Sequence, residues 1–330
     1  MSRRFWLILS ILLILVILPV AAYAGVGTVV YNLISAIDIH CSERNYANAT
    51  PEQFIMRADY EIDVTPYLIT DPYQTVNFPA RNSPDVNISA WYIPAVNAPQ
   101  SAPTVIVVHG LTSCRREASL LMSASILHRA GFNVLLPDLN DHGDSDNVDG
   151  RFSAGIREHL DVLGGFDWLV AEADIDPNRI GVMGFSLGGG TAAIAFSQEP
   201  RLMALWTDAS FADLEKTVAY ELKQEYGLPA FLAGSAVMMG QAIDGVDISL
   251  YSPLEAFGSA RAGRPVYLVH GTADERISVD FAYDLTAAVQ ATDPSFTPWL
   301  VEGAKHTESL FLYPTEYETR LVTFFSAALP

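Results

Sequence analysis

The chain has 330 residues and carries 38 acidic against 19 basic side chains, a formal net charge of −19. A field of that sign repels nucleic acid and anionic lipid headgroups, so we expect neither as a partner. The two cysteines, Cys41 and Cys114, are too few for a disulfide framework and lack the spacing of a metal site. We expect Cys114 to pack as a small apolar residue in a loop. A bridge to Cys41 in an oxidising compartment is the alternative.

The N-terminal segment differs from the rest of the chain. Arg3 and Arg4 are followed by no charged residue until Asp38, and this run exceeds the roughly 20 apolar residues that cross a bilayer. We interpret residues 1–37 as an uncleaved anchor whose N-terminus is cytoplasmic, since both arginines precede the run. The alternative is a signal peptide with Ala22-Tyr23-Ala24 as its cleavage signal. The rest of the chain is then either anchored on the extracytoplasmic side or secreted.

Residues 38–58 mix polar and small side chains and are interpreted as a linker, followed by one folded domain over residues 59–330. Alternation of apolar and polar residues predicts antiparallel strands within 60–66, 74–80 and 86–94. The continuous apolar runs at 102–110 and 132–138 predict strands buried on both faces, with a helix over 115–130 between them.

Helices and strands then alternate along the chain. We expect further strands within 179–185, 202–209, 264–271 and 297–303, and helices over 156–173, from Leu187, and over 315–328. This order predicts an α/β fold whose central sheet is mostly parallel, with helices on both faces and the antiparallel strands at its N-terminal edge.

One interval, residues 209–264, interrupts the alternation with apolar helical sequence. It is too long for a plain crossover, so we interpret it as a small helical cap over the carboxyl edge of the sheet. Its apolar side chains either line a substrate pocket or form the core of the cap. They include Phe231, Leu232, Met238 and Met239.

A serine surrounded by glycines follows the predicted strand at 179–185. The stretch Gly184-Phe185-Ser186-Leu187-Gly188 has the pattern of a nucleophile elbow, in which a strained strand-to-helix turn exposes the serine hydroxyl. Glycines two residues before and after the serine are needed because the backbones there pass too close for a Cβ atom. A simple glycine turn is the alternative interpretation.

Two further residues follow predicted strands in the order that a catalytic triad requires. Asp274 follows the strand at 264–271 and His306 follows the strand at 297–303. A serine hydroxyl needs a base to take its proton, which His306 can do, while Asp274 would orient the imidazole. His109 and His270 are alternative bases but abut their strands, and Asp208 is the alternative acid.

The oxyanion of an acyl-transfer reaction needs fixed backbone donors. We expect these to be the N–H groups of Leu187, directly after the serine, and of Leu111, in the loop after His109-Gly110. Thr112 and Ser113 are expected to be loop residues. The acidic stretch at 138–146 is interpreted as a solvated loop and not as a metal site, and we expect no metal or cofactor.

Five stretches carry a resemblance to the α/β-hydrolase superfamily, and most of all to bacterial serine hydrolases of the esterase and serine-aminopeptidase-like type. They are VIVVHGLTSCRRE, GFNVLLPDLNDHGDSD, DPNRIGVMGFSLGGG, VYLVHGTADERI and GAKHTES, between Thr104 and His306. The resemblance implies a cofactor-free acyl-enzyme mechanism with Ser186, Asp274 and His306 as the triad. The oxyanion loop departs from the glycine-rich HGGG of some esterases, since Leu111 and Thr112 follow His109-Gly110.

We therefore expect a serine hydrolase that cleaves carboxylic esters of small molecules and is held to a membrane by its N-terminal helix. The alternatives are a peptidase or amidase of the same mechanism, or an acyltransferase that passes the acyl group to an alcohol other than water. A non-catalytic binding module is the remaining alternative, and any turnover would exclude it.

Overall fold

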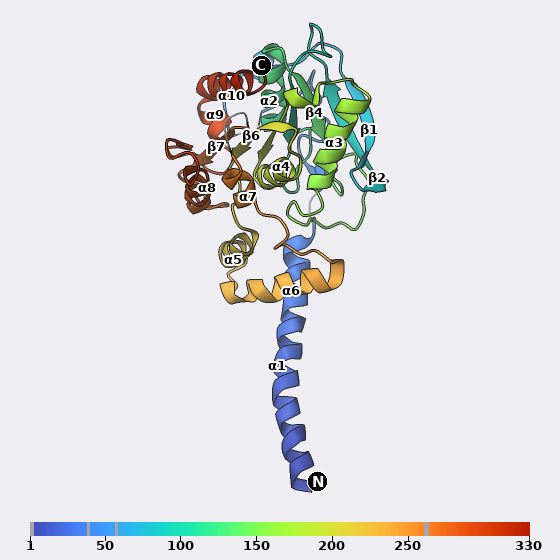
Figure 1. The fold of residues 1–330 in the computed structure, drawn as a ribbon, viewed down its shortest axis with the longest axis vertical. Coiled ribbons are helices and arrows are strands. Elements are labelled where there is room, and N and C mark those ends of the chain that lie inside the picture. The colour runs from blue at the N-terminus through green and yellow to red at the C-terminus, as the bar shows by residue number, and fades with distance from the viewer. Residues whose placement is uncertain (1–2, 38–39, 57–58, 261–263) are drawn as a thin grey trace. The chain divides into compact units, whose positions relative to one another are not determined.

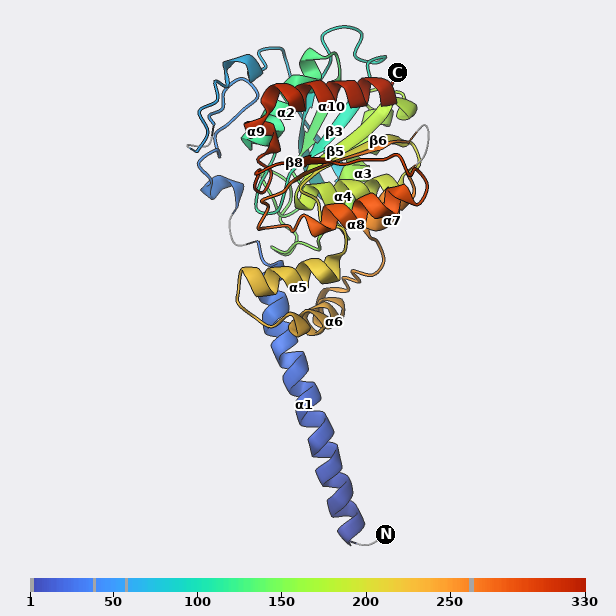
Figure 2. The same cartoon turned by 90° about the vertical axis from the view of Figure 1, so that its left-hand side faces the viewer.

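The computed structural model describes residues 3–37, 40–56, 59–260 and 264–330, with a sheet and helices drawn in Figures 1 and 2. The ends of the predicted linker at 38–58 and the last part of the predicted cap at 209–264 lie outside the described residues. The described chain forms two compact units. One comprises residues 37–213 and 250–330, and the other comprises residues 1–36 and 214–249.

The larger unit is built on an eight-stranded sheet in the order β1-β2-β4-β3-β5-β6-β7-β8. The strands are β1 Gln74–Ala80, β2 Ser83–Ile93, β3 Thr104–Val108, β4 Asn133–Pro137, β5 Ile180–Phe185, β6 Leu202–Asp208, β7 Val266–Gly271 and β8 Trp299–Val301. Strands β1 and β2 are antiparallel and form one edge, and all pairings from β4 to β8 are parallel. This confirms the predicted sheet and its antiparallel N-terminal edge.

Helices cover both faces of the sheet. In Figure 2, α2 and α10 lie on one face, and α3, α4 and α8 lie on the other. The helices of this unit are α2 Ala118–Arg129, α3 His159–Ala171, α4 Leu187–Gln198, α7 Pro253–Gly258, α8 Asp280–Gln290, α9 Ser309–Leu312 and α10 Pro314–Ala328. Strands β3, β4 and β5 have no exposed residue, which explains their continuous apolar sequences.

Sequence predictions at residues 60–66 and at Cys114 are wrong. The strand expected within 60–66 is absent from the described residues, where a short 3₁₀ turn, Thr65–Tyr67, follows irregular chain. Tyr60, Ile62 and Val64 still pack against the core as partly buried side chains, so their alternation reflects contact with the core and not sheet pairing. Cys114 is fully buried as expected, but it forms a disulfide with Cys41.

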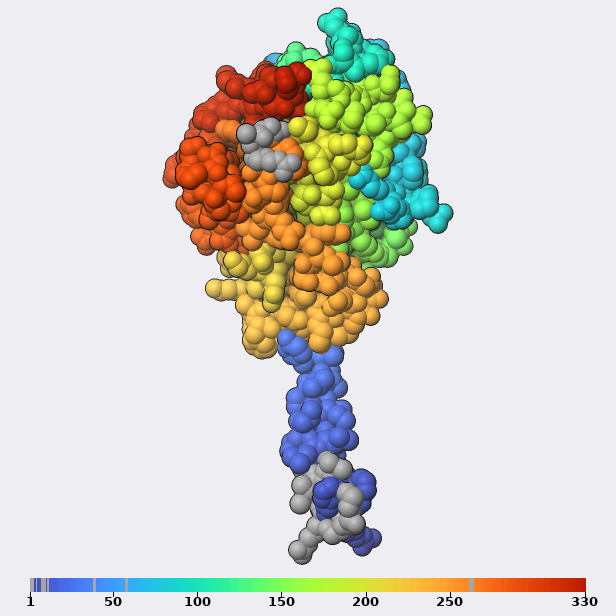
Figure 3. Space-filling model, viewed as in Figure 1, coloured from blue at the N-terminus to red at the C-terminus, as the bar shows by residue number. Residues whose placement is uncertain are grey.

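The smaller unit joins the N-terminal helix α1, Arg3–Ser35, to α5, Leu214–Gln224, and α6, Ala233–Asp244. A short 3₁₀ helix, η4 at Ala230–Leu232, precedes α6. Figure 3 shows the atoms of α5 and α6, in yellow and light orange, next to the visible part of α1. Part of the predicted cap therefore packs with the predicted anchor. Its place over the sheet stays a prediction.

Candidate active site

Ser186 occupies a sharp turn between β5 and α4. The strand ends at Phe185 and the helix begins at Leu187, and the serine between them has φ 54° and ψ −122°. Its backbone N–H donates to the carbonyl oxygen of Asp208 at 2.8 Å, which ties the turn to the end of β6. A non-glycine residue in this conformation is strained and is held there by its surroundings.

Gly184 and Gly188 make this turn possible. A Cβ atom on Gly184 would lie 2.1 Å from the carbonyl oxygen of Gly188, and one on Gly188 would lie 2.3 Å from that of His109. Both distances are far inside van der Waals contact. The need for glycine on each side of the serine, expected from the elbow pattern, therefore has a direct cause in backbone crowding.

The structure brings His306 and Asp274 to this serine. Nε2 of His306 lies 2.8 Å from Oγ of Ser186, and Nδ1 of the same ring lies 2.8 Å from Oδ2 of Asp274. The Asp274 side chain is fully buried, while that of His306 is 25% exposed. Oδ1 of Asp274 also accepts the backbone N–H groups of Arg276 and Ile277 at 2.9 and 2.8 Å, which fixes the carboxylate. With Nδ1 donating to Asp274, Nε2 is left to accept the serine proton.

Neither alternative histidine has a described hydrogen bond to Ser186, although Nε2 of His270 lies 3.5 Å from Oδ2 of Asp274. Nδ1 of His109 donates to the carbonyl oxygen of Gly110 at 2.7 Å, and its Nε2 accepts the backbone N–H of Leu139 at 2.9 Å. Burial and the nearby ring of His142 lower the pKa of His109 to about 3, so it stays neutral. Nε2 of His270 lies 2.9 Å from the carbonyl oxygen of Ile277, and burial lowers its pKa as well. The His109 ring is bonded to the loops that follow β3 and β4, and the His270 ring to the loop that follows β7.

Asp208, the alternative acid, ends β6 and is completely buried. Burial raises the pKa of its carboxyl to about 8; the Tyr317 hydroxyl opposes the shift, and the charge of Asp274 adds to it. No described hydrogen bond joins Asp208 to a histidine. Its backbone carbonyl holds Ser186 in place, which is a positioning contact that the sequence pattern did not reveal.

The two backbone N–H groups expected to bind an oxyanion, those of Leu111 and Leu187, donate no described hydrogen bond, and their role stays a prediction. Leu187 is the first residue of α4, where amide groups have no partner within the helix. Leu111 lies in the loop after β3. Backbone N–H groups without a partner are what a developing oxyanion requires.

The loop that carries Leu111 is held by contacts with residues that come earlier and later in the chain. Arg44 donates to Thr112 through Nε, 3.1 Å from the carbonyl oxygen, and through Nη2, 2.6 Å from the hydroxyl. Cys114 is joined to Cys41 in the same segment. On the other side, the buried Arg115 pairs with Asp138 at 3.2 Å. Nothing in the sequence pattern pointed to Arg44.

The acidic stretch at 138–146 is not a solvated loop throughout, which corrects the sequence interpretation. Asp138 and Asp141 are buried. Oδ1 of Asp141 accepts the backbone N–H groups of residues 148, 149 and 150, at 2.7 to 3.0 Å. The Asp138 carboxylate is therefore paired with Arg115, and the Asp141 carboxylate accepts backbone amides. Among the described residues, no group of three or more His, Cys, Asp or Glu side chains is arranged to hold a metal ion.

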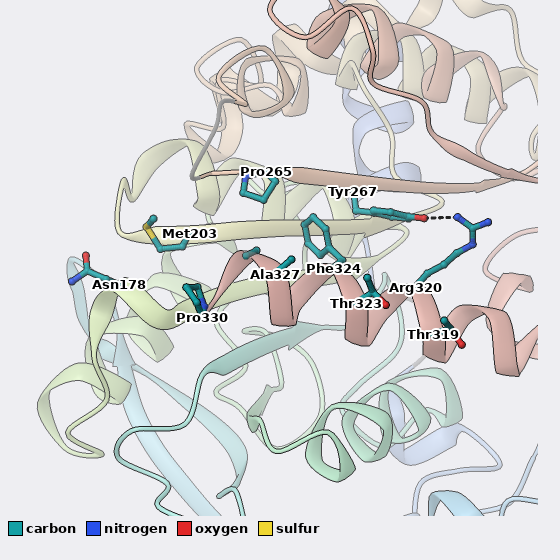
Figure 4. Close-up of a pocket in the computed structure, with 11 residues that line it drawn as sticks. Asn178, Met203, Pro265, Tyr267, Thr319, Arg320, Thr323, Phe324, Ala327 and Pro330 are labelled. Carbon is teal, nitrogen blue, oxygen red and sulfur yellow. Dashed lines mark hydrogen bonds between the residues drawn. The ribbon is translucent and has the colours of Figure 1, made fainter.

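A groove of about 720 Å³ lies elsewhere on the larger unit, along α10 and the starts of β6 and β7 (Figure 4). Met203, Pro265 and Phe324 contribute apolar surface, and Arg320 donates to the Tyr267 hydroxyl at 2.9 Å. None of Ser186, Asp274 or His306 lines it. The groove is therefore not part of the candidate active site.

Sequence comparison identifies the family. A model of the prolyl oligopeptidase family matches residues 119–329, which is more than half of the chain. A curated protein from Escherichia coli, an uncharacterized 31.7 kDa protein of the traX-finO intergenic region, is 30% identical over 37% of this chain. The match spans 42% of that relative's length. The quorum-quenching protein AidA of Acinetobacter baumannii is 31% identical over 40% of this chain and 43% of its own length.

Solved structures share the fold. An esterase of Pyrococcus furiosus superposes with a TM-score of 0.64 and 24% identity, over 85% of this chain and all of the esterase chain. A puromycin-hydrolyzing peptidase of Mycobacterium tuberculosis superposes with a TM-score of 0.62 and 19% identity, over 82% of this chain and 41% of the peptidase. The predicted fold class is confirmed. The chain belongs to the prolyl oligopeptidase family, within the α/β-hydrolase superfamily.

Proposed function

We propose that this chain is a serine hydrolase that cleaves carboxylic esters through an acyl-enzyme on Ser186. The observation that carries the proposal is the continuous chain of contacts from Oγ of Ser186 through His306 to Asp274, with both distances at 2.8 Å. Membership of a family of serine hydrolases supports the same chemistry.

Each residue has a defined part in the proposed reaction. His306 Nε2 takes the hydroxyl proton as Oγ of Ser186 attacks the ester carbonyl carbon, and Asp274 stabilises the imidazolium. The carbonyl oxygen becomes an oxyanion, which the N–H groups of Leu111 and Leu187 stabilise. His306 then gives its proton to the departing alkoxide, leaving the acyl group on Ser186. Water repeats these steps and releases the acid.

A peptidase or amidase of the same mechanism is the second candidate. It is favoured by the family description and by the likeness to peptidases among the solved structures. The leaving nitrogen of an amide needs fuller protonation than the leaving oxygen of an ester. The values of kcat/KM for matched esters and amides therefore distinguish the two activities. The side chain of Leu111, in place of a glycine, narrows the oxyanion side of the proposed site and favours small acyl groups.

Turnover of matched substrates tests this proposal. The purified full chain is assayed with p-nitrophenyl esters of increasing acyl length and with aminoacyl p-nitroanilides, beside Ser186→Ala. We expect short-chain esters to give the higher kcat/KM and Ser186→Ala to lose turnover of every substrate. Preference for the anilides would establish the peptidase alternative. Ester turnover that survives in Ser186→Ala would contradict the role of this serine.

We further propose that α1 anchors the chain in a membrane, with the hydrolase unit on the extracytoplasmic side. Helix α1 is long and apolar enough to span a bilayer, and Arg3 and Arg4 precede its apolar run. The Cys41–Cys114 disulfide supports export, because disulfides persist in oxidising compartments. An intact mass that includes residues 1–24, measured on protein from carbonate-washed membranes, is the expected result. A mature N-terminus at Gly25 would establish the cleaved form.

A further inference from the structure

Helix α6 runs across α1 and not along it (Figure 1), and both helices belong to the smaller unit. Their backbones approach closely at the crossing. A Cβ atom on Gly27 would lie 2.5 Å from the carbonyl oxygen of Ser235, and one on Gly240 would lie 2.7 Å from the ring of Tyr31. Glycine on each helix is what allows this separation, so the crossing point along α1 is fixed by sequence.

The crossing is also a small core. Val30 and Tyr31 of α1 are buried against Leu222 of α5 and against Ala233 and Ala236 of α6. The Tyr31 hydroxyl bonds to the carboxylate of Asp244 at the end of α6. The C-terminal turns of α1 therefore hold α5 and α6 in a defined arrangement.

The length of α1 sets the level of this crossing in a bilayer. About 20 residues, rising about 1.5 Å each, cross a hydrocarbon core of about 30 Å. Counted from Phe5, directly after Arg3 and Arg4, such a span ends near Ala24. The contacts with α6 include Tyr23, whose hydroxyl would lie 3.3 Å from a Cβ atom on Gly234, and Gly27 in the next turn. A helix that crosses α1 at this level lies in the headgroup layer and parallel to it.

The sequence of η4 and α6 suits that layer. Residues 228–243 contain no charged side chain. Phe231, in η4, is 70% exposed, and Met238, in α6, is 43% exposed. Large apolar side chains that remain exposed together mark a surface with a partner. Elsewhere in 214–249 five acidic residues outnumber two lysines, so this partner is apolar and not an anionic headgroup.

We propose that η4 and α6 form an interfacial membrane-binding surface, in which Phe231 and Met238 insert at the boundary between headgroups and acyl chains of the bilayer that α1 crosses. The inference rests on the anchor proposed above. An amphipathic helix in this position buries its apolar face to a depth of about 5–10 Å. The smaller unit would then have two contacts with the membrane, one across it and one along its surface.

Depth-dependent fluorescence quenching tests the surface in the full-length chain. Met238→Cys and Phe231→Cys are each labelled with an NBD fluorophore and reconstituted in phosphatidylcholine vesicles. The native cysteines are joined in a disulfide and do not compete for the dye. Glu225→Cys, at an exposed charged residue of the same unit, is the matched control, and Leu15→Cys reports the span. Quenchers are lipids with a doxyl group at carbon 5 or carbon 12, and aqueous iodide.

We expect the labels at 238 and 231 to be quenched at least about twice as strongly by 5-doxyl lipid as the label at 225, which iodide should quench instead. The label at 15 should respond to 12-doxyl lipid. If it does, but the labels at 231 and 238 match the control, the membrane surface is wrong and the anchor stands. Shielding from iodide without lipid quenching would show that protein covers the surface, which also overturns the inference. Loss of quenching at 15 would overturn the anchor and this inference together.

Discussion

Thr112 has an unfavourable backbone conformation beside the expected oxyanion donor. Its φ of 54° lies in the left-handed region, which costs a non-glycine residue about 1–3 kcal/mol. Arg44 contacts both its carbonyl oxygen and its hydroxyl. The same loop is tied two residues later by the Cys41–Cys114 disulfide. We therefore expect Arg44 to position the N–H of Leu111, although it touches no reacting atom.

Arg44→Ala should lower kcat about tenfold to a hundredfold for ester hydrolysis, because a donor displaced by a fraction of an ångström stabilises the oxyanion poorly. KM should change little, since the contact acts on the transition state. Steady-state kinetics of the variant beside Arg44→Lys, which should recover part of the rate, is the measurement. Arg320→Ala, which removes a similarly bonded arginine of α10, is the control. An equal fall in both alanine variants would refute a specific role.

Asp208 should make stability depend on pH. Burial raises the pKa of its folded-state carboxyl to about 8, above the ordinary 3.8, so the folded chain holds this proton over a pH range in which the unfolded chain has lost it. The contribution of Asp208 to the free energy of unfolding is therefore highest below the pKa that this residue has in the unfolded chain. It falls as pH rises towards the pKa of Asp208 in the folded chain. Asp208→Asn keeps the neutral form at every pH. Relative to the parent, its free energy of unfolding should rise by at least about 1 kcal/mol between pH 5 and pH 8.

Thermal unfolding at pH 5 and pH 8 measures this difference. The exposed Asp85 gives the control variant Asp85→Asn, which should shift the melting temperature equally at both pH values. A difference between Asp208→Asn and the parent that does not change with pH would show that the carboxyl is not held neutral.

The elements around the serine depend on one close approach between β3 and α4. Gly188→Ala would place a Cβ atom 2.3 Å from the carbonyl oxygen of His109, so helix α4 and the loop after β3 must separate. We expect kcat/KM to fall at least about a hundredfold and the melting temperature to drop. Gly258→Ala, where a Cβ atom meets no neighbour within 4 Å, is the control. A Gly188→Ala enzyme with normal activity would contradict the crowding argument.

Elements buried on both faces were the most predictable. Strands β3, β4 and β5 were expected from continuous apolar runs because no other element of their length has that sequence. Helix α8 was missed, although its buried Phe281, Leu285 and Val289 recur every four residues, the usual signal of an amphipathic helix. The segment at 60–66 shows the reverse error, since alternation records burial of every second side chain and not the presence of a strand partner.

At the scale of the whole molecule, the sequence indicated which residues meet at the candidate site better than it indicated how the chain is organised. Ser186, Asp274 and His306 could be found because each follows a predictable strand, and strands of one parallel sheet end at one edge. The Cys41–Cys114 disulfide joins residues 73 positions apart, and Arg44 reaches Thr112 across a similar interval. Such contacts are set by the folded path of the chain. The helices at 214–249 show apolar faces in sequence, but not that α1 covers them.

Covalent labelling by a fluorophosphonate tests the central claim most directly. The measurement is which residue is labelled and whether the labelling rate depends on His306. The full chain and His306→Gln are treated with the reagent, and the modified peptide is located by mass spectrometry. We predict a single adduct on Ser186, with a labelling rate at least about a thousandfold lower in His306→Gln, because the hydroxyl then has no base. An adduct on another residue, or an unchanged rate in His306→Gln, would contradict the account.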